Sequence, residues 1–256
     1  MSDFSEEVEF RINANQNNQV LRVASQHFLL ATIEARYSYN FSWMGRPIIQ
    51  YPQDIVAMQE LIWQVKPDLI IETGIAHGGS LIMSASMLAQ LDICEAIECG
   101  QNIDPRISKR KVLGIDIDIR AHNLSAIEAH PMASRIHMIQ GSSISPEVVA
   151  RVKEFTVKFK RIMVCLDSNH THDHVLSELE AYAPLTSVGS YCVVFDTVLE
   201  EIPNEMLFDR PWGPGNSPKT AVWKFLETHS EFVIDQAVQN KLQVTVAPDG
   251  YLKRVS

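Results

Sequence analysis

The sequence has little cysteine, proline or glycine, no excess of positive charge and no long uninterrupted apolar run. It holds 4 cysteines, 12 prolines and 11 glycines among 256 residues. These small shares exclude collagen-like and low-complexity chains, and 46% hydrophobic residues is too high for a disordered chain. A chain of this length buries a full core without disulfides or a structural metal. We therefore expect one large domain, or one domain with an appendage.

The charge balance is negative, with 22 lysines and arginines against 31 aspartates and glutamates and a net charge of −9. This argues against nucleic acid or an anionic membrane as the main partner, but it is compatible with a small cationic ligand. No C-x-x-C pair indicates a zinc knuckle or a redox dithiol. The N-terminus lacks the pattern of a signal peptide, and no apolar run approaches the roughly 18 residues of a membrane span. We expect a reduced, cytoplasmic protein.

Five short runs after residue 67 are almost continuously apolar, which is typical of strands buried on both faces of a parallel sheet. They are residues 68–74, 111–118, 135–141, 161–167 and 190–196. Helical patterns lie between and beside them, at residues 80–90, 124–130, 146–159 and 172–183. Because strands and helices alternate, the sequence predicts right-handed crossovers and an α/β fold with helices on both faces of the sheet.

Both ends of the chain depart from this alternation. Residues 203–218 hold four prolines and two glycines, which predicts a long irregular loop before a helix at 218–228. Two alternating runs, 232–238 and 241–247, predict an antiparallel hairpin that closes the sheet edge. We interpret residues 1–66 as an N-terminal helical appendage that carries part of a ligand site or a subunit contact. Residues 67–256 would form the α/β domain.

The first predicted strand runs directly into a glycine-rich turn and a helix, in the segment ETGIAHGGS at residues 72–80. Ligands of open parallel sheets bind at the carboxyl ends of the strands, near the point where strand order reverses. Glycines allow a tight turn, and the free N–H groups of a helix start favour an anionic group. The segment is either such a ligand site or a tight turn that binds nothing. Its spacing is not G-x-G-x-x-G, which disfavours a nicotinamide cofactor.

The other strands end in acidic or small polar residues. Asp116 ends the second run, where a carboxylate can accept hydrogen bonds from ribose hydroxyls. Ser142 and Ser143 follow the third run, in a position suited to an adenine edge. Asp167 and Asp196 end the fourth and fifth runs. These two carboxylates could hold a hard divalent cation, or they could simply cap helices.

Histidines and aromatic residues leave further alternatives open. His170 suits a general base because imidazole titrates near neutral pH, or it is a hydrogen-bonded surface residue. If a helix starts near Thr171, His170 and His174 share a face, either as a ligand pair or as exposed polar groups. The alternating aromatic residues of 37–43 either line a pocket or anchor the appendage to the sheet.

Five ordered motifs resemble the cephalosporin hydroxylase family, which includes the rhamnosyl O-methyltransferases. They are ETGIAHGGS (72–80), LGIDIDIR (113–120), IQGSS (139–143), LDSNHTHDHV (166–175) and AYAPL (181–185). The Gly213-Pro-Gly215 loop and the closing segment 248–254 also look like that family, and the likeness runs from about residue 48 to the end. The resemblance implies the Rossmann-like, doubly wound fold of class I methyltransferases, with a mostly parallel seven-stranded sheet.

The resemblance also implies roles for individual residues around S-adenosylmethionine (SAM) and Mg²⁺. Five residues would hold the methionine portion of SAM, namely Glu72, Gly74, His77, Gly78 and Ser80. Asp116 would bind the ribose, and Ser142 or Ser143 would lie beside the adenine. Asp167 and Asp196 match metal positions, with Asp167 also beside the cofactor, and His170 matches the base of related sugar methyltransferases.

One departure from the family pattern concerns the fifth strand. Relatives usually end it with an acidic pair, whereas this chain has Phe195-Asp196. The loss of one carboxylate would weaken Mg²⁺ binding, leave water in that position or mean that no metal is used. The hydroxyl of Thr197 is a candidate for partial compensation.

We therefore predict a SAM-dependent O-methyltransferase that acts on a hydroxyl of a sugar or secondary metabolite, assisted by a divalent metal, with Asp167 and His170 as catalytic residues. One alternative is a hydroxylase or oxygenase component of a biosynthetic pathway, although oxygenases with two histidines and a carboxylate are commonly all-β. The other is a non-catalytic partner subunit that binds the cofactor, which Phe195 favours. We expect a small-molecule acceptor, no nucleic-acid or membrane partner, and a homo-oligomer.

Overall fold

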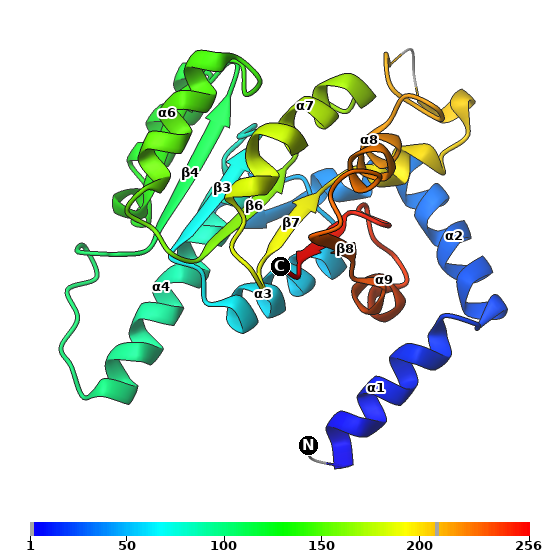
Figure 1. The fold of residues 1–256 in the computed structure, drawn as a ribbon, viewed down its shortest axis with the longest axis horizontal. Helices are drawn as coiled ribbons and strands as arrows, with labels where there is room; N and C mark the ends of the chain where they lie inside the picture. Colours follow the sequence, from blue (N-terminus) through cyan, green and yellow to red (C-terminus); the bar gives the residue numbers. More distant parts are fainter. Residues whose placement is uncertain (1–2, 208–209) are drawn as a thin grey trace.

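A seven-stranded sheet forms the centre of the molecule in the computed structural model, which describes residues 3–207 and 210–256 (Figure 1). Its strand order is β5-β4-β3-β6-β7-β9-β8. The strands are β3 (Leu69–Thr73), β4 (Lys111–Asp116), β5 (Ile136–Gln140), β6 (Ile162–Leu166), β7 (Tyr191–Val194), β8 (Phe232–Ile234) and β9 (Tyr251–Arg254). The strands from β5 to β7 are parallel, and β9 pairs antiparallel with both β7 and β8. The predicted α/β fold with a mostly parallel seven-stranded sheet is confirmed.

The antiparallel edge exists, but the predicted hairpin is wrong: only residues 232–234 of its first run form a strand, and its second run forms none. β8 pairs with residues 251–254 rather than with 241–247. Residues Gln236–Leu242 form a helix, α9, whose N-cap Asp235 accepts a hydrogen bond from the Ala237 N–H. An N-cap aspartate followed by glutamine, alanine and lysine favours a helix, and this local preference outweighs the alternating pattern.

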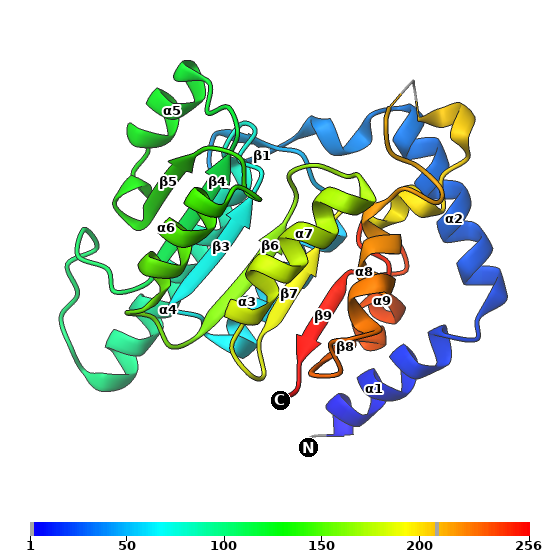
Figure 2. The same cartoon turned by 45° about the horizontal axis from the view of Figure 1, so that its top comes forward.

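Helices cover both faces of the sheet (Figure 2). One face packs against α3 (Pro52–Val65), α4 (Gly79–Cys99) and α5 (Ala121–Glu128). The other packs against α6 (Pro146–Thr156), α7 (His172–Tyr182) and α8 (Pro218–Leu226). Successive side chains of a strand point to opposite faces, so Ile70 joins the first core while Leu69 and Ile71 join the second. Every residue of β3 is buried, as expected for a central parallel strand.

The N-terminal part continues into the first core. It comprises α1 (Asp3–Asn15), α2 (Gln19–Glu34) and a two-stranded sheet of β1 (Phe41–Trp43) and β2 (Arg46–Ile48). Leu29 of α2 and Ile48 of β2 lie in the same buried cluster as the residues of α3 and α4. Helix α1 lies beside α9, extends away from the sheet and buries none of its residues (Figures 1 and 2).

Short 3-10 helices connect several of these elements. They are η1 (Tyr37–Asn40), η2 (Ala133–Arg135), η3 (Ala183–Leu185), η4 (Thr197–Glu200) and η5 (Asn204–Met206). The described part of the predicted 203–218 loop is irregular apart from η5, the first turn of α8 and one isolated bridge. Residues 208 and 209 of that loop lie outside the described residues.

Helix α4 continues to Cys99, beyond its predicted end at Gln90. By length and composition alone this helix would suffice to cross a membrane, but half of its apolar 18-residue stretch is buried inside the fold. A core helix of a globular protein can have the same length and composition, so this is weak evidence for a membrane span.

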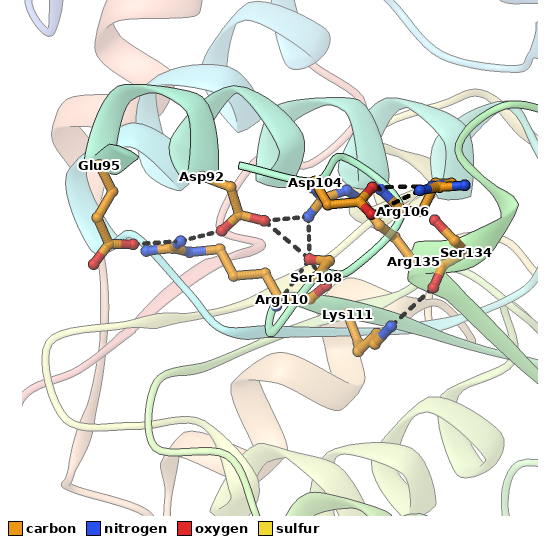
Figure 3. A network of polar contacts seen from close by, with 9 residues as sticks. All are labelled: Asp92, Glu95, Asp104, Arg106, Ser108, Arg110, Lys111, Ser134 and Arg135. Carbon is orange, nitrogen blue, oxygen red and sulfur yellow. Dashed lines mark hydrogen bonds and ion pairs between the residues drawn. The ribbon is translucent and has the colours of Figure 1, made fainter. Parts of the chain in front are cut away.

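A polar network near the C-terminal end of α4 holds the segment that follows this helix (Figure 3). Asp92 lies between Arg110 and Arg135 and bonds to both, and it also accepts a hydrogen bond from the Ser108 hydroxyl at 2.9 Å. Burial alone would raise the pKa of Asp92, but these hydrogen bonds and the charge of Arg135 lower it. The network lies near the amino end of β4, opposite to the sheet edge where the sequence predicts a ligand.

A buried carboxylate on α3 holds the C-terminal segment against the core. Asp54 accepts hydrogen bonds from the hydroxyls of Thr245 and Tyr251 and from the Val246 N–H, the last two at 2.7 and 3.0 Å. These bonds explain why residues 244–247 cross to α3 instead of pairing with β8. Burial raises the pKa of Asp54 to about 6, although the three hydrogen bonds oppose this change.

We expect Asp54 to make stability depend on pH. Between its ordinary pKa of 3.8 and its folded pKa of about 6, the folded protein keeps a proton that the unfolded chain releases. The free energy of unfolding should therefore fall as pH rises through this window, by on the order of 1 kcal/mol per pH unit. Denaturant titrations of the wild type and of Asp54→Asn at several pH values would measure the difference. If the difference in unfolding free energy between the wild type and Asp54→Asn stayed the same from pH 4 to 6.5, this assignment would be contradicted.

Candidate active site

A cavity of about 320 Å³ lies at the carboxyl ends of β3, β6 and β7. From β3 the chain adds β4 and β5 on one side, and it later adds β6 and β7 on the other. The cavity therefore lies where strand order reverses, which is the usual ligand position in open α/β sheets. Residues 47–50, which begin in β2, form part of its wall.

The glycine-rich turn between β3 and α4 is pressed against its neighbours. Gly74 has φ +88°, and a Cβ there would lie 2.0 Å from the backbone oxygen of Asp167. A Cβ on Gly79 would lie 2.2 Å from the backbone oxygen of Pro47. Gly78 has φ +82° and faces the side chain of Ile127 rather than the cavity. Only glycine fits these positions, so the backbone itself forms this part of the cavity wall.

Replacing Gly74 by alanine should destabilise the protein and remove ligand binding at the turn. The added methyl meets backbone atoms of Asp167 and Ser168, which follow β6, and the alanine takes an unfavourable φ, so we expect a loss of roughly 3 kcal/mol in unfolding free energy. Gly189→Ala is a matched control, because Gly189 has φ +81° but open space around its Cβ position. Denaturant titration of both variants isolates the clash, and equal losses would show that Gly74 is not crowded.

The start of α4 offers free backbone N–H groups. Gly78 is its N-cap, no side chain caps the first turn, and His77, Gly79 and Ser80 line the cavity. The buried carboxylate of Glu72 also lines it and accepts a hydrogen bond from the Ser84 hydroxyl. Burial raises the pKa of Glu72. Four of the five residues predicted for the methionine portion therefore meet at the cavity, and Gly78 supports it from behind.

Asp116 lies beneath the turn rather than in the cavity wall. Its Oδ2 accepts hydrogen bonds from the N–H groups of Ile75 and Ala76 at 2.7 and 3.2 Å, and its Oδ1 accepts one from Asp118. Oδ1 therefore retains one lone pair for a further donor. The predicted contact with a ribose stays a prediction.

The two serines after β5 do not line the cavity. The Ser143 hydroxyl contacts His174 Nε2 at 3.1 Å, and the same nitrogen lies 3.2 Å from the Ser168 hydroxyl. Because α7 begins at His172, His170 precedes the helix and does not share a helical face with His174. Of the two alternatives considered for His170 and His174, a ligand pair on one helical face is therefore not supported, and the adenine contacts of Ser142 and Ser143 stay predictions.

Asp167, His170 and Asp196 form a cluster in the cavity wall, next to the turn that contains Gly74. One donor atom from each lies within 4.8 Å of the others, and His170 Nε2 is 3.4 Å from Asp196 Oδ2. Burial raises the pKa of Asp167 well above its usual range, and the nearby charge of Asp196 raises it further. Two crowded carboxylates and an imidazole form a donor set suited to a divalent cation, which would relieve the repulsion between them.

Phe195 contributes no ligand to this cluster. Its side chain is buried in the first core and lines the cavity, so the strand end supplies the single carboxylate of Asp196. The suggested compensation by Thr197 is wrong. Thr197 is fully buried, does not line the cavity, and donates its hydroxyl proton to the Pro248 carbonyl at 2.6 Å.

Sequence reasoning missed the residue that packs on His170. The indole of Trp212 contacts the His170 imidazole edge to face, with ring centroids 4.9 Å apart. Asn216 holds this part of the loop by donating to the Pro211 carbonyl and accepting from the His172 N–H. A tryptophan beside the Gly213-Pro-Gly215 motif is a signal, but the sequence does not reveal which histidine it meets.

Comparison with known proteins identifies the family. A model of the rhamnosyl O-methyltransferase/CmcI family matches residues 35–255. The chain belongs to this family. It is thereby placed among SAM-dependent O-methyltransferases, as the motifs at residues 72–80, 113–120 and 166–175 predict.

Curated relatives and solved structures agree with this placement. The chain is 28% identical over 218 residues to a rhamnosyl O-methyltransferase of Mycobacterium bovis, covering 83% of this chain and 78% of the relative. It is 26% identical over 215 residues to one of Mycobacterium leprae, covering 83% and 82%. A CmcI structure described as holding Mg and SAM has the same fold, with a TM-score of 0.55, 18% identity and coverage of 85% and 78%.

The aromatic segment at residues 37–43 serves mainly as an anchor. Tyr37 packs against Phe41 and Tyr51, and the Trp43 indole donates to the Ser86 hydroxyl at 3.0 Å. Of the four alternating aromatic residues, Tyr39 alone lines the cavity. The two roles considered for this segment are therefore divided among its residues.

Proposed function

We propose that this protein transfers a methyl group from SAM to a hydroxyl of a sugar or secondary-metabolite alcohol, with help from a divalent cation. The observation that carries the proposal is the composition of a single cavity. Its wall combines a helix start that no side chain caps and the buried Glu72 with the cluster of Asp167, His170 and Asp196.

The cofactor end fits the charges of SAM. The N–H groups of the turn at Ser80 suit its carboxylate, and Glu72 suits its ammonium group. Gly74 lets the turn lie directly against the Asp167 backbone, so main-chain atoms form this part of the wall. Asp116 would accept a hydrogen bond from a ribose hydroxyl through its remaining lone pair, and the serines after β5 would lie beside the adenine. The sulfonium of bound SAM supplies an activated methyl group.

At the cluster of Asp167, His170 and Asp196, this chain's residues position the acceptor and remove its proton. Asp167 and Asp196 would hold the cation, which lowers the pKa of a bound hydroxyl. The acceptor oxygen forms a bond to the methyl carbon while the sulfur–carbon bond breaks, and the hydroxyl proton goes to a nitrogen of His170. The contact with Asp196 and the packing of Trp212 orient that imidazole. Exclusion of water by the surrounding loops favours the transfer.

A sugar hydroxyl is the acceptor that the comparisons support. The mycobacterial relatives are named rhamnosyl O-methyltransferases, so we propose a deoxyhexose or a similar natural-product sugar. We further propose a cytoplasmic homo-oligomer. All four cysteines are free, in keeping with a reducing compartment.

Phe195 favours one second function. In it, the protein would bind the cofactor as a partner subunit but would not catalyse methyl transfer. The apolar side chain of Phe195 replaces a carboxylate that relatives usually have, so cation binding would rest on fewer ligands. Tight binding of S-adenosylhomocysteine (SAH) without turnover of any sugar acceptor would favour this function over catalysis.

Isothermal calorimetry with SAH tests the proposed function. We expect micromolar binding of SAH and no comparable binding of nicotinamide cofactors. We also expect methyl transfer to at least one of a panel of rhamnosides and other deoxyhexosides when Mg²⁺ or Mn²⁺ is present. No SAH binding at millimolar concentration would reject the proposal.

A further inference from the structure

The turn between β3 and α4 is held from outside by side chains of two other elements. Arg46 of β2 donates to the His77 carbonyl through Nε at 3.0 Å and through Nη2 at 2.6 Å. Asn123 of α5 donates to the Ala76 carbonyl at 2.8 Å. The two side chains also join each other, because Arg46 Nη2 donates to Asn123 Oδ1 at 2.9 Å. Neither residue lines the cavity.

Ala76 needs this support because its backbone is strained. Its φ is +45°, a left-handed conformation that residues with a Cβ rarely adopt. Gly74 and Gly78 on either side also have positive φ, but glycine adopts it freely. Strain of this kind persists where the surroundings overdetermine the backbone. Here the Ala76 N–H is held by Asp116 and its carbonyl by Asn123.

The same contacts determine where the turn's cavity-lining residues lie. His77, Gly79 and Ser80 follow directly after the strained residue and line the cavity. β2 also closes on the turn from outside, because a Cβ on Gly79 would meet the Pro47 backbone oxygen. The N-terminal segment therefore shapes the cofactor end of the cavity.

Arg46 also brings a positive charge to this turn. Within the described residues, the carboxylates make no ion pair with Arg46, and its donors go to the neutral oxygens of His77 and Asn123. Its charge therefore adds to the positive end of α4, which favours an anionic ligand group at the turn.

We propose that Arg46 and Asn123 are positioning residues for cofactor binding. They hold Ala76 in its strained conformation and so direct the N–H groups of Gly79 and Ser80 toward the cofactor carboxylate, whereas the Gly78 N–H donates to the Ile75 carbonyl. This inference rests on the proposed function, because it assumes that SAM occupies this cavity. It also assigns part of the cofactor site to the N-terminal segment, through Arg46.

Calorimetry with SAH on single variants tests the proposal. We expect Arg46→Ala and Asn123→Ala each to raise the Kd for SAH by about 10- to 30-fold, while the affinity for Mn²⁺ alone stays unchanged. Arg46→Lys keeps the charge but loses the two-donor contact with His77, so it should show an intermediate rise. Arg22→Ala is the matched control, because Arg22 also donates to a carbonyl, that of Gln16, outside this cavity.

A second substitution separates positioning from general loss of structure. Glycine adopts positive φ without strain, so Ala76→Gly should recover SAH affinity several-fold in the Asn123→Ala background. It should change affinity little in the wild type. Hydrogen exchange of the peptide covering residues 74–80 should be faster in Asn123→Ala and should slow when SAH is added. These exchange data decide the case where a variant is too unstable for calorimetry.

The outcomes distinguish this inference from the proposed function. If the wild type does not bind SAH, the proposed function fails. If the wild type binds SAH and the variants at positions 46 and 123 bind it equally well, with unchanged exchange at residues 74–80, the positioning role is wrong. Equal affinity loss in Arg22→Ala would also overturn it.

Discussion

Replacing Asp167 by asparagine should abolish measurable binding of a divalent cation and leave the fold intact. Loss of an outer partner of a metal ligand typically costs roughly 10- to 100-fold in affinity, and loss of a ligand should cost at least as much. Asparagine keeps the shape of the side chain and removes its negative charge. Burial and the nearby charge of Asp196 both destabilise that charge. We therefore expect an unchanged or higher thermal midpoint together with the lost cation binding.

Calorimetry with Mn²⁺ and Mg²⁺ measures this effect. Asp173→Asn is the control, because Asp173 lies in the first turn of the nearby α7 but outside the cavity and the cluster. SAH binding should persist in both variants, since asparagine keeps the side-chain shape and leaves the backbone contact between Asp167 and Gly74 in place. Unaltered cation affinity in Asp167→Asn would exclude Asp167 as a ligand.

Replacing His170 by alanine should lower the rate of methyl transfer by roughly 10²- to 10⁴-fold, the usual contribution of a general base. Cation and SAH affinities should change little, because in this account Asp167 and Asp196 hold the ion and β3 and α4 hold the cofactor. Initial rates with the best sugar acceptor of the panel, together with calorimetry on the same sample, measure both quantities.

The control for this variant is His172→Gln. His172 contacts the Thr220 hydroxyl at 2.8 Å and does not line the cavity, so its replacement should leave the rate within a few-fold. If His170→Ala loses cation affinity as strongly as Asp167→Asn, the imidazole is a metal ligand and another group takes the proton. A rate loss below fivefold would remove His170 from the mechanism.

Much of the fold can be predicted from the sequence where local pattern and tertiary environment agree. The helices predicted to start at Pro146 and Pro218 begin at those residues, and the ends of the five parallel strands lie within two residues of those of the apolar runs. Buried parallel strands and a proline at a helix start leave a strong local signature. The run at 241–247 lacks such agreement, because its alternation competes with the helix start at Asp235 and with the hydrogen bonds of Asp54.

The candidate site is predictable to the extent that its residues lie at strand ends. Asp167 and Asp196 come together because parallel strands end at the same sheet edge, and the motif at residues 72–80 joins them for the same reason. Contacts between distant segments leave no such signal. Arg46 reaches the turn from β2, and Trp212 reaches His170 from an irregular loop, so neither partner can be inferred from spacing.

A crystal structure of the protein with SAH and Mn²⁺ tests the central claim most directly. We predict SAH density with its amino-acid portion at the turn of residues 77–80, its ribose beside Asp116 and its sulfur directed toward His170. An anomalous manganese peak should lie between Asp167 and Asp196. Density that places SAH elsewhere, or side chains that fill the space beside Gly74 in the crystal, would contradict the account.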